Sequence, residues 1–197
     1  MIVRRFVVSV FAATLLVGAC GGDPPPPPPP PGPDQDSLQA YNDSVAASEA
    51  ASRADAERVA AERAAEAERQ RLIREARSVL EEMVFFDYDV SEIRDDAASD
   101  LRAKVDILRA SPQVQLRIEG HADERGSTEY NMALGNRRAE AIRQFLTGFG
   151  LTEDRFEIVS FGEGRPLQQG DTETSWARNR RGQFVITAGA NAINPGD

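Results

Sequence analysis

The chain has 197 residues, a formal net charge of −9 and one cysteine, Cys20. The acidic balance argues against nucleic acid as a partner and against electrostatic binding to anionic lipid. A single cysteine excludes an internal disulfide, so an apolar core must hold the fold, and the C-terminal ~105 residues are enough for one such core. Lys104 is the only lysine, so arginine carries almost all of the positive charge.

The first 20 residues have the pattern of a lipoprotein signal peptide. Arg4 and Arg5 precede an apolar run over 6–16, and small residues separate this run from Cys20. These are the marks of a secretory signal, and the run is too short for a membrane-spanning helix of ~20 residues. We predict a signal peptide over 1–19 and acylation of Cys20, with palmitate as the expected fatty acid. The alternative is an ordinary signal that leaves a free thiol, which is uncommon in an oxidising compartment.

Two segments of biased composition follow the signal. Residues 20–36 contain eight consecutive prolines, which extend as polyproline II over about 25 Å. Residues 37–82 are rich in Ala, Glu and Arg, lack Gly and Pro, and place opposite charges four apart, as in Glu49 and Arg53. We predict a stiff tether and then a solvated helical spacer of about 65 Å. Weak self-association is the alternative, although the apolar positions of a coiled coil are not sustained.

Residues 83–188 have the pattern of one α/β (α+β sandwich) domain. Apolar or alternating stretches predict strands at 83–87, 114–118, 156–161 and 183–187. Helices are predicted at 91–110, from the cap Ser127 to about Gly148, and at 174–179. The strand–helix–strand–helix–strand order predicts right-handed crossovers and a mixed sheet with helices packed on it. Residues 189–197 are predicted to be a disordered tail.

The clearest motif is Gly120-His-Ala-Asp-Glu-Arg-Gly126, at the end of the second predicted strand. Further blocks lie at residues 85–89, 130–139, 158–162 and 179–181. In these blocks the chain resembles the OmpA-like peptidoglycan-binding domain, and more narrowly the peptidoglycan-associated lipoproteins. The resemblance covers residues 83–187, and several ordered blocks are more specific than one short motif. The long helix and the octaproline go beyond the usual short linker of these lipoproteins.

The resemblance implies a pocket for diaminopimelate, an amino acid of the peptidoglycan stem peptide. The end of its side chain carries an ammonium and a carboxylate on one carbon, so a pocket needs one anion and one cation. By resemblance, Asp123 accepts from the ammonium and Arg138 donates two parallel N–H bonds to the carboxylate. The motif residues that shape or line the pocket are Asn131, Leu134, Tyr88 and Asp89. Asn131, Leu134 and Arg138 lie at i, i+3 and i+7, so we expect them on one helix face. A surface salt bridge of Asp123 with Arg138, worth only ~0–1 kcal/mol, is the alternative.

Other polar residues have simpler interpretations. His121 is the only histidine, and a metal site would need further Cys or His ligands, so we expect neither a metal nor a cofactor. A structural hydrogen bond behind the pocket is expected for His121, and Arg180 and Arg181 are expected to brace the last strand. The acidic residues that would allow a glycosidase pair are Asp87, Asp89, Glu119, Asp123 and Glu124. A peptidoglycan hydrolase is therefore an alternative function, although no nucleophile–base–orienter set or zinc motif is present.

The resemblance implies a structural lipoprotein that is not an enzyme. It implies a lipid anchor in the outer membrane and a domain that binds peptidoglycan in the periplasm. Gly21, and not an aspartate, follows Cys20, which favours the outer membrane in lipoproteins of this kind. It further implies a role in a Tol–Pal system, in envelope integrity and constriction at cell division, with TolB as a partner. A tether that acts without a Tol system is the alternative.

Overall fold

The computed structural model describes residues 32 and 34–196. The predicted signal peptide, the lipidation site Cys20 and the octaproline therefore lie outside the described residues. The chain forms two units, Met1–Arg53 and Ala54–Asp197. Among the described residues, no helix combines the length and the apolar character that crossing a membrane requires.

Helix α1 spans Gln35–Glu81, a stretch without Gly or Pro. Exposed ion pairs three or four residues apart run along it; Arg58, for example, lies 2.7 Å from Asp55 and 2.5 Å from Glu62. Such pairs add ~0.3–0.5 kcal/mol each, so helix propensity contributes most of the local preference. The predicted long helix is confirmed. Close to its end, Ala76 and Leu80 are buried in the core of the second unit, so the last turns of α1 belong to the domain.

Four strands form one mixed sheet in the order β1-β4-β2-β3. Strand β2 (Gln115–His121) pairs in parallel with β3 (Phe156–Gly162) and antiparallel with β4 (Arg181–Ala188). The short strand β1 (Val84–Phe85) pairs antiparallel with β4. A parallel pair needs a crossover connection, and helix α3 (Thr128–Gly148) supplies it. The predicted α+β architecture with a mixed sheet is confirmed.

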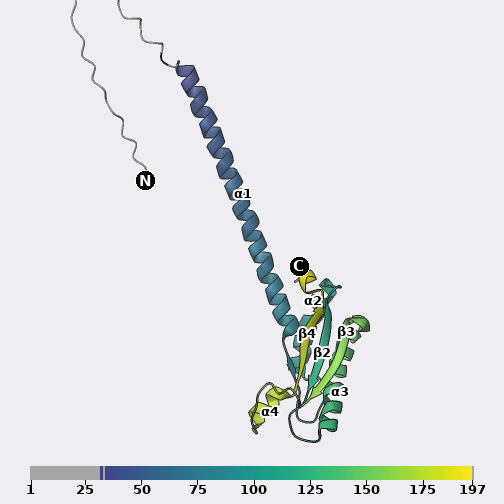
Figure 1. Cartoon of the computed structure of the whole chain (residues 1–197). Coiled ribbons are helices and arrows are strands. Elements are labelled where there is room, and N and C mark those ends of the chain that lie inside the picture. Colours follow the sequence, from purple (N-terminus) through teal and green to yellow (C-terminus); the bar gives the residue numbers. More distant parts are fainter. Residues whose placement is uncertain (1–31, 33, 197) are drawn as a thin grey trace, which may run out of the picture. The chain divides into compact units, whose positions relative to one another are not determined.

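Helices α2 (Asp95–Ala110) and α3 pack against one face of the sheet, as Figure 1 shows for α3 beside β2 and β3. Helix α3 begins at the predicted cap: the Ser127 hydroxyl accepts a hydrogen bond of 3.2 Å from the Tyr130 backbone N–H. Helix α2 begins at Asp95 and not at residue 91, because the preceding Arg94 has extended backbone angles. The short elements are η1 (Glu153–Arg155), α4 (Glu173–Asn179) and η2 (Ala190–Ala192).

The core consists of apolar side chains between the sheet and helices α2 and α3, and it extends into the segment after β4. Ile193 is only 5 % exposed and belongs to this core. Ser111 Oγ donates to the Asn194 carbonyl oxygen at 3.2 Å and accepts from the Asn194 backbone N–H at 2.8 Å. The prediction of a disordered tail is corrected for residues 189–196, because burial of one apolar side chain and these two hydrogen bonds order the segment.

Candidate ligand-binding site

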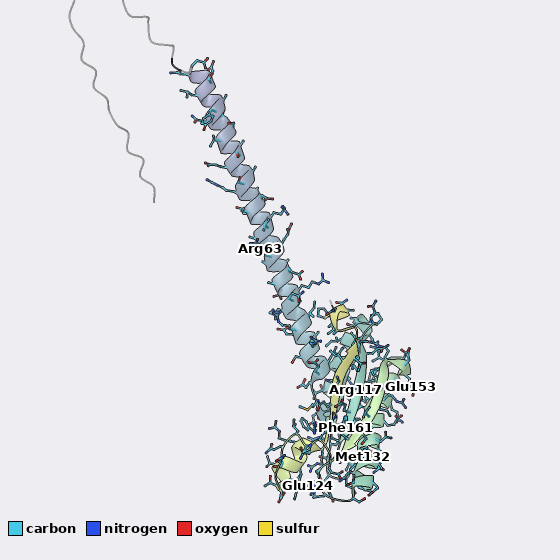
Figure 2. All side chains as sticks on the ribbon, viewed as in Figure 1. Arg63, Arg117, Glu124, Met132, Glu153 and Phe161 are labelled. Atoms are coloured by element: carbon cyan, nitrogen blue, oxygen red, sulfur yellow. The ribbon has the colours of Figure 1, made fainter. Side chains whose placement is uncertain are left out.

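The site lies at the carboxyl end of β2, where the chain turns into α3. Helix α3 approaches this end of the sheet closely, because Gly120 on β2 faces Gly135 on α3. Helix α4 closes the same end, since Trp176 Nε1 donates to Glu124 Oε1 at 3.0 Å. Glu124 is labelled there, beside α4, in Figure 2. The two helices and the turn thus surround one small region.

A cavity of about 90 Å³ occupies this region. Its lining residues are Tyr88, Asp89, Asp123, Arg125, Gly126, Tyr130, Asn131 and Leu134. Five of the six residues that the sequence predicts for the pocket are in this lining, and Arg138 is not. Tyr88 and Tyr130 are exposed at the rim, whereas Asp123, Asn131 and Leu134 are buried. The cavity therefore has a polar, acidic floor and an aromatic rim.

Asp123 is the charged residue at the floor, and two arginines surround it. Arg125 Nη2 donates to Asp123 Oδ2 at 2.7 Å, and Arg180 Nη1 donates to the same oxygen at 3.3 Å. Asp123 Oδ1 accepts from Arg125 Nε at 3.0 Å and from the Arg125 backbone N–H at 3.1 Å. Burial would raise the pKa of Asp123, but the hydrogen bonds from Arg125 and Arg180 outweigh it, so the pKa lies below its ordinary value. Asp123 is therefore a stable anion at neutral pH.

Asp89 and Tyr130 join the two sides of the rim. The Tyr130 hydroxyl donates to Asp89 Oδ1, and this hydrogen bond raises the pKa of the tyrosine. Asp89 has a φ of 56°, in the left-handed region that favours glycine, so its turn is held in a strained conformation. A side-chain hydrogen bond across 41 residues of sequence helps to hold that turn against α3.

Asn131 places a buried amide at the cavity. The residue is 1 % exposed and belongs to the lining. Its side chain interacts with Glu163 and helps to lower the pKa of that carboxyl group, although Nδ2 and Glu163 Oε2 do not meet at full hydrogen-bond geometry. The amide is therefore a buried donor that both Glu163 and a group in the cavity can use.

Arg138 lies behind the cavity and not in it. It is fully buried and donates to three backbone carbonyl oxygens: Asp87 O and Val90 O at 2.9 Å, and His121 O at 2.8 Å. Burial lowers the pKa of Arg138 to about 10, so it stays charged at neutral pH. The expected direct contact of Arg138 with a ligand carboxylate is not what the structure shows, because the guanidinium donates to three backbone carbonyl oxygens behind the cavity.

His121 also departs from its prediction. Both ring nitrogens are buried without a hydrogen bond among the described residues, so the expected structural hydrogen bond is absent. The ring stacks on Phe161 with 5.5 Å between centroids. Burial, with Arg181 and Arg165 nearby, lowers the pKa of His121 to about 3, so the ring is neutral. Its backbone carbonyl, and not its ring, contributes to the site by accepting from Arg138.

A larger cavity of about 360 Å³ lies on the other side of the turn that holds Asp123. It is lined by Ala122, Glu124, Glu163, Pro166, Gln168, Gln169, Gly170, Asp171 and Asn179. None of these lining residues is cationic, so the larger cavity does not offer both charges that a zwitterion requires. Within the described part of the chain, no group of three or more His, Cys, Asp or Glu side chains is arranged to hold a metal ion.

Sequence reasoning missed three lining residues: Arg125, Gly126 and Tyr130. Arg125 and Gly126 belong to the motif that points to the site, and Tyr130 directly precedes Asn131, so proximity in sequence was the available signal. Arg180, expected to brace the last strand, donates instead to Phe86 O at 3.1 Å in the segment after β1, and it also reaches Asp123. The basic side of the site therefore comes from Arg125 and Arg180.

The OmpA family model matches residues 85–180. The peptidoglycan-associated lipoprotein of Brucella melitensis is 47 % identical over 103 residues, which are 52 % of this chain and 61 % of that protein. The peptidoglycan-associated lipoprotein of Pseudomonas aeruginosa is 44 % identical over 97 residues, which are 49 % and 57 % of the two chains. The matches thus cover about three fifths of these relatives' own length.

Solved structures give the same result for the fold. The peptidoglycan-associated lipoprotein from Burkholderia pseudomallei superposes with a TM-score of 0.52 at 40 % identity, over 53 % of this chain and 89 % of that one. The C-terminal domain of Helicobacter pylori MotB has a TM-score of 0.51 at 19 % identity, over 56 % and 88 % of the two chains, and shows the fold alone.

The mixed sheet, the covering helices and the cavity at the end of β2 define an OmpA-type domain, and the chain belongs to the OmpA family. Within that family, it is similar to the peptidoglycan-associated lipoproteins, at 42–47 % identity in the domain.

Proposed function

We propose that the chain is a lipid-anchored structural protein whose domain binds peptidoglycan without forming a covalent bond. The ligand group is the zwitterionic end of diaminopimelate in the stem peptide, and the site is the cavity at the end of β2. In this proposal, the domain tethers the outer membrane to the cell wall. The observation that carries it is a buried anion, Asp123, beside the buried amide of Asn131, in one cavity of an OmpA-family domain.

Asp123 would bind the ammonium of the ligand, and Asn131 would bind its carboxylate. A carboxylate with a lowered pKa stays charged and can accept charge-assisted hydrogen bonds. The carboxylate of the ligand would accept from Asn131 Nδ2. Arg138 lies behind the cavity with three bonds to backbone carbonyl oxygens, so it would act on the ligand carboxylate through its positive charge. Tyr88, Asp89 and Leu134 would then enclose the carbon chain.

The anchor and partners are part of the same proposal. The sequence of residues 1–20 supports lipidation of Cys20, and Gly21 after it favours the outer membrane. The proposal further includes a role in a Tol–Pal system at cell division, with TolB as a partner, as the resemblance in sequence motifs implies. Metabolic labelling with palmitate tests the anchor: the wild type should be labelled, and Cys20→Ser should be unlabelled and released from membranes.

The hydrolase alternative is weaker at this site. A glycosidase needs a carboxylic acid with a raised pKa as proton donor. Asp123 has a lowered pKa, and both of its oxygens are occupied by arginine donors. A binding protein should sediment with purified sacculi, whereas a hydrolase should release soluble fragments from them.

Co-sedimentation of the full chain in detergent with purified sacculi tests the site, with free diaminopimelate as competitor. We expect binding that the competitor reduces and that Asp123→Asn weakens. Loss of a partner of a desolvated charge typically costs about 2–5 kcal/mol, or ~30-fold or more in affinity. Glu157→Gln is the control, because this exposed carboxylate on β3 is not part of the cavity lining. Undiminished binding of Asp123→Asn, with circular dichroism like that of the wild type, would place the ligand elsewhere.

A further inference from the structure

Arg125 occupies the position beside Asp123 that a ligand ammonium would take. A carboxylate has about four positions for hydrogen-bond donors. Arg125 fills three of them through its backbone N–H, Nε and Nη2, and Arg180 Nη1 fills the fourth. An ammonium therefore cannot bind Asp123 until a present donor leaves.

Arg125 also lines the cavity, which has a volume of about 90 Å³. Movement of its side chain away from Asp123 therefore enlarges the space that a ligand can enter.

Arg125, and not Arg180, is the residue free to move. The Arg180 side chain is 6 % exposed and donates to Phe86 O at 3.1 Å and to Glu173 Oε1 at 2.6 Å. The Arg125 side chain is 29 % exposed, and its Nη1 lies 3.8 Å from Glu173 Oε2. A second anion is therefore already within a short reach of Arg125.

Two aromatic rings hold the Arg125 guanidinium on both sides. Its carbon Cζ lies 4.0 Å from the ring centroid of Tyr88 and 4.1 Å from that of Trp176. A cation over an aromatic face is attracted to the whole ring, and not to one atom. The guanidinium can therefore slide between the rings toward Glu173 without losing this attraction.

We propose that Arg125 is a displaceable internal competitor for Asp123. As a ligand ammonium enters, the Arg125 side chain exchanges Asp123 for Glu173 and the cavity opens. The inference rests on the proposed function of the site. The exchange implies selectivity, because a simple amine gains only the interactions that Arg125 gives up, whereas a zwitterion also gains a hydrogen bond from Asn131 and the attraction of the Arg138 charge.

The test compares sacculus affinities of the full chain in detergent. Arg125→Gln should bind about fivefold more tightly than the wild type, which corresponds to ~1 kcal/mol for a partly exposed pair. Arg125→Lys should lie between the two, because an ammonium competes without the planar fork. Arg143→Gln is the matched control: its side chain is 24 % exposed, is paired with Glu140 at 2.7 Å, and lies far along α3 from the cavity.

Fluorescence of Trp176, the only tryptophan, reports the movement directly. Free diaminopimelate should change the emission of the wild type and leave that of Arg125→Gln nearly unchanged. If Arg125→Gln binds sacculi as the wild type does, or more weakly, the proposed role of Arg125 as a competitor for Asp123 is wrong. Arg125 would then have a structural role or contact the ligand directly. Asp123→Asn separates the two proposals. If Asp123→Asn loses sacculus binding and Arg125→Gln does not gain any, the binding site stands and only the role of Arg125 as a competitor is wrong. If Asp123→Asn binds sacculi like the wild type, the proposed binding site is wrong.

Discussion

Gly120 on β2 and Gly135 on α3 lie in direct backbone contact, so that a Cβ on Gly120 would stand 1.8 Å from the Gly135 carbonyl oxygen. This contact sets the distance between the helix and the strand. It thereby places the α3 side chains of the site, Asn131 and Arg138, against the end of β2.

Gly120→Ala should destabilise the domain and disturb the site together. The new methyl group meets backbone atoms, which cannot rotate away, so the helix has to shift. Overpacking of a core costs typically about 1–3 kcal/mol. Urea unfolding should show this loss. Gly148→Ala is the control, because nothing lies within 4 Å of its Cβ at the end of α3; it should leave stability unchanged or slightly raised.

Arg138→Ala should destabilise the fold, whatever its effect on binding. Removal of the guanidinium leaves the carbonyl oxygens of Asp87, Val90 and His121 without their donor. A buried polar group without its partner costs ~1–3 kcal/mol, so we expect a total of about 3–5 kcal/mol. Arg137→Ala, an exposed neighbour on α3, should change stability by less than ~0.5 kcal/mol in the same urea titration. Equal stabilities of the two variants would contradict this structural role.

Leu80→Ala tests whether the end of α1 belongs to the domain. Leu80 is fully buried in the core, and its truncation should cost about 2–5 kcal/mol. Leu72→Ala on the same helix is the control, because Leu72 is 36 % exposed. Thermal unfolding of the full chain should show a lower midpoint for Leu80→Ala and a nearly unchanged one for Leu72→Ala. If both variants unfold like the wild type, the domain begins after α1.

Helical periodicity explains the part of the site that the sequence predicts well. A spacing of i, i+3 and i+7 fixes a common face, and Asn131, Leu134 and Arg138 are all buried on α3. The sequence predicts Ser127 as a cap because its side chain interacts locally with the N–H groups at the start of the helix. Such short-range rules do not depend on the rest of the fold.

The remaining features depend on contacts that the sequence does not contain. The role of Arg138 follows from the backbone carbonyl oxygens that the fold brings to it, and residues 48 and 51 positions away supply two of them. The role of Arg125 follows from the turn that directs it back onto Asp123 between two aromatic rings. Periodicity predicts which residues share a helix face, but only the folded domain shows which residues that face contacts.

Lys104 should make the stability of the domain rise with pH in the alkaline range. Its side chain is fully buried, donates from Nζ to the Val79 carbonyl oxygen in the last turn of α1, and lies 4.6 Å from the Phe184 ring centroid. Burial lowers its pKa from 10.5 to about 8, against the attraction of Glu82 and Asp100. Between these two values the unfolded chain binds more protons than the folded one, so unfolding becomes less favourable as pH rises.

Lys104 is the only lysine in the chain, so no other lysine titrates in this window. Each pH unit across it contributes at most ~1.4 kcal/mol, so we expect the wild type to gain about 1–2 kcal/mol between pH 7.5 and 9.5. Lys104→Met fills the same space without a charge and should show no such rise. Urea unfolding at several pH values measures the free energy of unfolding of the wild type and of Lys104→Met. Arg102→Met, an exposed position on the same helix, is the control and should show the same rise in stability with pH as the wild type. A wild type whose stability is flat or falls over this range would show that the buried ammonium does not carry a lowered pKa.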